Sequence, residues 1–250
     1  MNARLVLGAI ALAIALLAIV VPIAIHIASP GKDTFIRWLI DLATKSAWRW
    51  RYLDVETAKK LGARYTIENA SNLLIYARSS RIVIEKGLGI AYIYGEKHSV
   101  ENYGNGTLGV SMANAVLYAE IPRLRVLSIE GDSLTIGIEG IEGDTLSLDV
   151  SRSFVDIDGA RARQSIEIAI DRGVLRGSIA LDANVSSIVL KVDKASLDLD
   201  LYLAPGIGLE VTRKNVGSCI IDVEAPPCRT RCIPITIVCS NGIIRIDVER

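Results

Sequence analysis

The chain has few of the residues that catalysis and metal binding require. It contains only two histidines, His26 and His98, and neither lies in a metal-binding or triad-like motif. The segment 109–113 lacks the second glycine of a nucleophile elbow, and the segment 87–89 is typical of a turn. Aspartates in the repeats, such as Asp198, lack the glycine-rich turn of calcium-binding solenoids. We therefore predict no enzyme and no catalytic, cofactor-binding or metal-ligating residue.

The chain also lacks an excess of charge of one sign, because 28 basic residues balance 28 acidic residues. It therefore has no global basic field to gather nucleic acid, and no nucleic-acid partner is predicted. Glutamine is nearly absent, isoleucine is abundant, and charges of both signs are frequent. This composition is typical of a thermophile.

One uncharged stretch near the N-terminus is unusually long. Leu5–Ile25 contains no charged residue and follows Arg4. About 20 apolar residues cross a bilayer as a helix, so we predict that residues 1–28 form a transmembrane anchor in the lipid bilayer. A cleaved signal peptide is the alternative, although its apolar core is usually shorter and the small-x-small site ending at Ala28 is spoiled by His26.

All four cysteines, Cys219, Cys228, Cys232 and Cys239, lie near the C-terminus. An even number of cysteines outside the cytoplasm favours disulfides. Zinc is less favoured, because only Cys228 and Cys232 have the spacing of a zinc knuckle. We predict the pairs Cys219–Cys239 and Cys228–Cys232, and pairing of each loop cysteine with a strand cysteine is the alternative.

Three glycosylation sequons, at Asn69, Asn105 and Asn184, support the same compartment. Together with the cysteines they predict a single-pass protein of the cell membrane. Its N-terminus would lie inside and its C-terminal domain would be an extracytoplasmic glycoprotein.

The spacing of hydrophobic residues divides the rest of the chain into a helical part and a part made of strands. Residues 29–63 are predicted to be a juxtamembrane helical segment, with a last turn from Asp54 to Leu61 that ends at Gly62. Residues 64–250 show the period of two typical of strands, for example at 81–84 and 89–94. The polar, glycine-rich stretch 96–109 predicts a loop.

An internal repeat is the strongest feature of the C-terminal part. A small hydroxyl residue followed by three aliphatic residues at alternate positions recurs, so that one face is apolar and the other polar. The phrases are 133–138, 145–150, 165–170, 187–192 and 196–201, with a last form, lacking the hydroxyl, at 243–248.

These phrases predict a mainly β fold, in which the N-terminal transmembrane helix and a short amphipathic helical segment precede a domain of stacked β-strand repeats. A β-solenoid is the preferred arrangement and a β-sandwich the alternative. The last phrase, Ile243–Val248, ends the chain and is predicted to be an open edge guarded by charges such as Arg245 and Asp247.

The segment from Ile121 to Leu134 resembles the rung motif of the prokaryotic "putative adhesin" β-solenoid domains, which include head-domain and toast-rack repeats. The resemblance covers about residues 120–250 and implies architecture more than activity. From it and the anchor we predict a structural, adhesive or surface-assembly role, by self-association or through a surface protein or glycan partner. The alternative is an envelope module that presents a ligand or partner site to a membrane complex.

Overall fold

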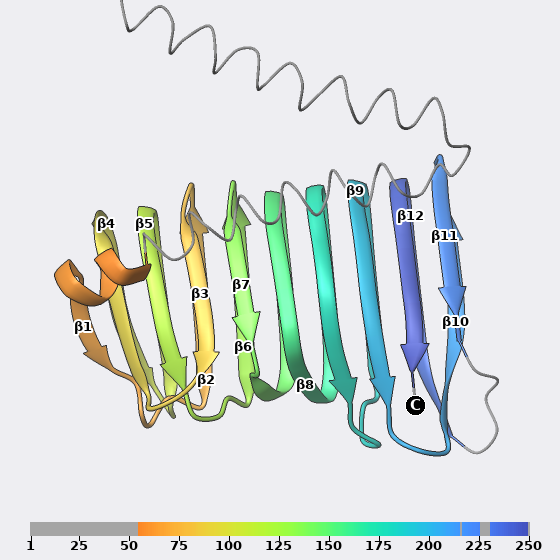
Figure 1. Ribbon diagram of the computed structural model, residues 1–250, viewed down its shortest axis with the longest axis horizontal. Helices are drawn as coiled ribbons and strands as arrows, with labels where there is room; N and C mark the ends of the chain where they lie inside the picture. Colours follow the sequence, from red (N-terminus) through yellow and green to blue (C-terminus); the bar gives the residue numbers. More distant parts are fainter. Residues whose placement is uncertain (1–54, 216, 226–230, 250) are drawn as a thin grey trace, which may run out of the picture. The chain divides into compact units, whose positions relative to one another are not determined.

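The computed structural model describes residues 55–215, 217–225 and 231–249, which belong to one compact unit, Asp54–Arg250. A helical segment at residues 55–61 is followed by twelve strands that stand side by side (Figure 1). The strands are β1 (Ala63–Thr66), β2 (Asn72–Arg78), β3 (Arg81–Lys86), β4 (Ile90–Gly104), β5 (Thr107–Ile121), β6 (Val126–Asp132), β7 (Thr135–Glu139), β8 (Glu142–Leu181), β9 (Ser187–Leu203), β10 (Ile207–Asn215), β11 (Cys219–Glu224) and β12 (Arg231–Glu249).

The repeating unit is a bent pair of strand segments, which we call a rung, with a first and a second arm. β2 and β3 are the two arms of one rung, and β6–β7 and β10–β11 form two others. The long strands β5, β9 and β12 each run through both arms, and β8 runs through two successive rungs. Neighbouring rungs pair in parallel, so that equivalent residues stack in rows across the sheet.

Because apolar and polar residues alternate, the aliphatic side chains of each rung point to the inner side of the bend. There they stack on the equivalent side chains of the neighbouring rungs. Such rows bury apolar surface at every rung, which is the dominant favourable contribution to folding. In the central row of the first arms every side chain is at most 1% exposed. This row consists of Ile75, Ile129, Leu148, Ile168, Leu190 and Ile237.

Six of the bends are made by a residue in the left-handed backbone region, with φ between 47° and 58°. That conformation costs a residue with a side chain about 1 kcal/mol. Buried hydroxyls hold two of these corners. Ser80 Oγ donates to the Arg78 carbonyl at 2.7 Å and accepts from the Ala115 amide at 3.3 Å. The corner residues are Ser79, Asn114, Ser133, Arg152, Arg172 and Lys194.

The order of rungs in space differs from the order in the chain at both ends. The β2–β3 rung lies between β5 and β6–β7, and β4 pairs with β5 antiparallel at the end of the stack. At the other end, β12 lies between β9 and the β10–β11 rung. The prediction that Ile243–Val248 forms an open edge was therefore wrong, and the edge is formed by β10 and β11.

The predicted fold class needs correction in two respects. No helix among residues 55–249, as far as they are described, is long and apolar enough to cross a membrane, and the predicted span 5–25 lies outside that part. Moreover, the stack is not simply open, because six strands close into a ring of parallel pairs in the order β5, β2, β6, β8, β7, β3. The ring closes because β5 and β8 bend at Asn114 and Arg152 and so contribute both arms.

Two local predictions can also be compared with the structure. The helical turn ending at Gly62 is confirmed, since residues 55–61 are helical and the Gly62 amide donates to the Ala58 carbonyl at 2.9 Å. The predicted loop 96–109 was wrong, because most of it lies in β4 and β5, which pair closely up to the turn at residues 105–106.

Candidate functional site

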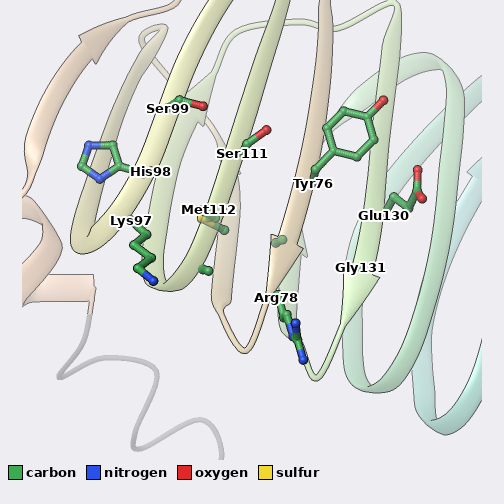
Figure 2. A pocket seen from close by; sticks show the side chains of 11 residues that line it. Tyr76, Arg78, Lys97, His98, Ser99, Ser111, Met112, Glu130 and Gly131 are labelled. Carbon is green, nitrogen blue, oxygen red and sulfur yellow. The ribbon is translucent and has the colours of Figure 1, made fainter.

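A groove of about 680 Å³ lies on the outer face of the first arms, where β4, β5, β2 and β6 are neighbours (Figure 2). Ser99, Ser111, Tyr76 and Glu130 stand opposite one another across these four strands. The two serines are short, whereas Tyr76 is tall and 46% exposed. The groove therefore has a low polar floor and an aromatic wall.

Two cations lie in the next row toward the corners. Lys97 on β4 and Arg78 on β2 are both exposed and flank Ala113 on β5. Two strand spacings separate their backbones by about 10 Å, and the small Ala113 leaves the space between them unfilled. Neither cation forms an ion pair with another residue in the described part of the chain. Arg78 does lower the pKa of Asp132, but the main cause of that shift is the hydrogen bond from Arg152.

A second exposed tyrosine lies on the same face. The Tyr103 ring covers Gly109, where any Cβ would meet the ring, and Tyr103 is 57% exposed. A hydrogen bond to Glu101 raises the pKa of the Tyr103 hydroxyl above its ordinary value, and the charge of Glu101 adds to the shift. Tyr103 therefore presents a neutral aromatic side chain at neutral pH.

His98 lines the groove, but hydrogen bonds to neighbouring residues fix its ring. Its Nδ1 lies 3.2 Å from the Gly95 carbonyl and its Nε2 lies 3.1 Å from the Tyr65 hydroxyl. Both ring nitrogens therefore have partners, which gives His98 a structural role. Within the described residues, no group of three or more histidine, cysteine, aspartate or glutamate side chains could hold a metal ion.

The outer face of the second arms carries a row of carboxylates, which we call the acidic row. One position of the row, between Asp158 and Asp200, is occupied by the uncharged Ser178. The neighbouring row alternates Asp156, Arg176, Asp198 and Arg245, and so balances its charge. The acidic row consists of Glu120, Glu85, Glu139, Asp158, Asp200, Asp247 and Glu224.

Asp200 in the acidic row and Asp132 at the end of β6 are expected to change stability with pH in opposite directions. Partial burial raises the pKa of Asp200, and Asp198, Asp247 and Glu249 add to the shift. Ionised Asp200 therefore opposes folding at neutral pH, and this cost disappears as the pH falls through its raised pKa. We expect Asp200→Asn to raise the free energy of unfolding at neutral pH, by up to about 1 kcal/mol.

Asp132 is the matched control, because the hydrogen bond from Arg152 lowers its pKa. A carboxyl with a lowered pKa stabilises the fold above its unfolded pKa and loses that effect in acid. Asp132→Asn should therefore lower stability at neutral pH and have a smaller effect near pH 3, where part of the stabilisation is already lost. Urea denaturation of both variants at about pH 7 and pH 3 tests this, and shifts of the same sign at neutral pH would contradict it.

At the N-terminal end of the stack, the helical segment covers part of the second-arm face. Val55 packs with Val83 and Tyr118 in a small apolar cluster, and Lys59 Nζ lies 4.0 Å from the centre of the Tyr118 ring. The Tyr118 hydroxyl lies 2.8 Å from Glu120 and 3.0 Å from Glu85, to which it donates. Burial and these carboxylates raise the pKa of Tyr118 far above its ordinary value.

The structure brings together one predicted pair of cysteines. Cys219 on β11 and Cys239 on β12 form a disulfide with a Cα–Cα distance of 6.2 Å, which confirms that pairing. Cys232 is also disulfide-bonded. Cys228 lies outside the described residues, so the Cys228–Cys232 pairing stays a prediction.

The three sequon asparagines are all exposed and share a position in the fold. Asn69, Asn105 and Asn184 each lie two or three residues before a first arm begins, at β2, β5 and β9. They therefore line the same side of the stack, where glycans would not disturb the core. Glycosylation itself stays a prediction.

The groove residues were not predicted from the sequence. Tyr76 and Arg78 occupy outward positions of an alternating run, which is a signal of exposure but not of a site. Lys97 and Ser99 fall in the stretch that was predicted to be a loop. Only the antiparallel register of β4 on β5 brings these residues beside Tyr76 and Arg78.

Comparisons with known proteins give one distant neighbour. No family model and no curated protein matches the chain. Among solved structures, the chain is similar to a "putative cell adhesion protein" from Clostridium sporogenes, with 10% identity and a TM-score of 0.37, over 75% of this chain and 98% of that one.

Proposed function

We propose that this protein is an extracytoplasmic surface module with a structural or adhesive role, which associates with a second copy of itself through the β10–β11 edge. The observation that carries the proposal is this open edge. Within the described residues β10 and β11 each pair only with β12, so the backbone groups on their other side are open to a further strand. The Cys219–Cys239 disulfide supports an oxidising compartment.

The edge also exposes apolar surface. Ile220 on β11 is 65% exposed, and Ile243, which lies opposite it on β12, is 40% exposed. At the opposite end of the stack, the four residues of β1 cover only Ile90–Ile93 of β4, and the rest of that edge, residues 94–104, is mostly polar or charged, which disfavours pairing. The apolar pair therefore favours association at the β10–β11 end.

Charge complementarity favours a second copy as the occupant. β10 runs toward the corner and β11 runs away from it, so a two-fold axis through the bend would place β10 antiparallel to the partner's β11. β10 carries the exposed Glu210, Arg213 and Lys214, a net charge of +1, and β11 carries the exposed Asp222 and Glu224, a net charge of −2. The symmetric pairing therefore sets a basic arm against an acidic arm twice.

Sedimentation velocity of the full chain tests this proposal. We expect a dimer for the wild type and a monomer for Ile220→Lys, which places a charge in the apolar pair. Leu88→Lys is the matched control, because Leu88 is 73% exposed but lies in the turn between β3 and β4. A wild type that stays monomeric at all concentrations, or a control that dissociates equally, would exclude the edge as the interface.

A second function, a binding module that presents a ligand site, is favoured by the groove on the first-arm face. The groove combines an exposed aromatic ring, hydroxyl groups and two cations without ion-pair partners among the described residues. Such convergent polar groups beside an aromatic ring are typical of ligand sites.

A further inference from the structure

We infer that the groove formed by Tyr76, Arg78, Lys97, Ser111 and Glu130 binds a glycan that carries carboxylate groups. The inference deepens the proposed surface role, on which it rests, by naming the class of ligand that the first-arm face would hold. The groove lies on β4, β5, β2 and β6, and so it is separate from the β10–β11 edge.

The aromatic wall fits the apolar face of a sugar ring. Tyr76 is 46% exposed, and its neighbour on β5 in the same row is the short Ser111 (Figure 2). An aromatic side chain offers an apolar body with a polar tip, and the tip can bond to a neighbouring hydroxyl. A pyranose ring lying over Ser111 would meet both.

The hydroxyl groups of the sugar would find partners in the same row. The Ser99 and Ser111 hydroxyls both donate and accept, and the Glu130 carboxylate accepts. Ser99, Ser111, Tyr76 and Glu130 stand in register across four neighbouring strands. The row therefore offers polar groups at intervals of about 4.8 Å, on both sides of the aromatic ring.

The two cations select for negative charge. Arg78 and Lys97 lie one outward position nearer the corners, about 7 Å along the strands from the Tyr76 row, with only Ala113 between them. A carboxylate on a sugar bound over Ser111 would enter this gap and accept hydrogen bonds from either cation. Glu130 lies on the other side of Tyr76, away from Lys97.

A peptide fits the groove less well. β5 and β2 are paired on both sides, so their backbone groups cannot accept an added strand as a sheet edge does. The apolar residue beneath the groove, Met112, is only 5% exposed, so no pocket for an apolar side chain opens there. An acidic peptide would have only the two cations to bind.

Calorimetric titration of the full chain with trigalacturonate tests the inference. We expect saturable binding, and little binding of the methyl-esterified trisaccharide, which keeps the rings but loses the charges. Arg78→Gln should weaken binding about tenfold, as expected for a lost charge-assisted bond, and Tyr76→Ser about fivefold. Both side chains are exposed, so neither substitution should disturb folding.

Arg123→Gln and Tyr202→Ser are the matched controls and should change affinity less than about twofold. Arg123 is exposed outside the groove, and Tyr202 is 42% exposed on the second arm of β9. The inference fails if the wild type does not bind trigalacturonate, if the ester binds equally, or if the controls weaken binding as much. Hexaglutamate that binds as tightly, with the same loss in Arg78→Gln, would assign the groove to acidic peptides instead. Sedimentation of the same samples keeps the two proposals separate, because loss of glycan binding with an intact dimer overturns only the groove.

Discussion

Replacing Ile168 by alanine is expected to lower the free energy of unfolding by about 4 kcal/mol. Ile168 is fully buried at the centre of the stack. It lies opposite Leu190 on one side, and on the other side it follows Leu148 in the row, both of which are also fully buried. Truncation removes apolar contacts with both neighbours, and the rungs on either side hold the cavity open because their backbones are hydrogen-bonded.

Two further variants distinguish the cost of the cavity from the cost that any substitution has for the free energy of unfolding. Ile168→Val should cost only about 1 kcal/mol, because it removes one methylene. Leu88→Ala, at a position that is 73% exposed, should cost less than about 1 kcal/mol. Urea denaturation followed by circular dichroism provides the measurement. An Ile168→Ala cost similar to that of Leu88→Ala would show that the central row does not carry the stability.

The arms of the central rungs could be predicted from the sequence because each arm buries one of its two faces and exposes the other. In the phrases at 145–150, 165–170 and 187–192, aliphatic residues alternate with polar ones, and each phrase became a first arm in register with its neighbours. A core beneath every rung forces this pattern. The same physical rule explains where prediction failed.

β4 shows the failure most clearly. Its residues 101–104 are all exposed, because the strand extends beyond the core at the end of the stack. Its backbone bonds to β5, rather than burial, hold it in place, and such bonds leave no pattern in the sequence. The polar and glycine-rich composition therefore predicted a loop.

The order of the rungs could not be predicted either. β12 lies between β9 and β10–β11, although the chain reaches β10 first. Any rung with aliphatic residues on its inner face can pack on any other, so alternation says nothing about which neighbours meet. The groove depends on that order, since it forms only because β2 lies beside β5 and not at the start of the stack.

Removing the Cys219–Cys239 disulfide is expected to lower the free energy of unfolding by about 3 kcal/mol, as for a bridge that closes a loop of this length. The two cysteines are 20 residues apart in the sequence. The bridge restricts the unfolded chain, and in the fold it ties β11 to β12. β11 has no other neighbour among the described strands, so it depends on this link more than an interior strand does.

The double variant Cys219→Ala/Cys239→Ala isolates this bond and leaves Cys228 and Cys232 unchanged. Urea denaturation of the full chain should show the loss, whereas Leu61→Ala, at a position that is 70% exposed and far from the β10–β11 edge, should cost less than about 1 kcal/mol. Hydrogen exchange should locate the effect, because amides of β11 lose protection first while those of β9, paired on both sides, keep it. Equal loss of protection in β9 and β11 would mean that the disulfide stabilises the whole stack and has no special role at its edge.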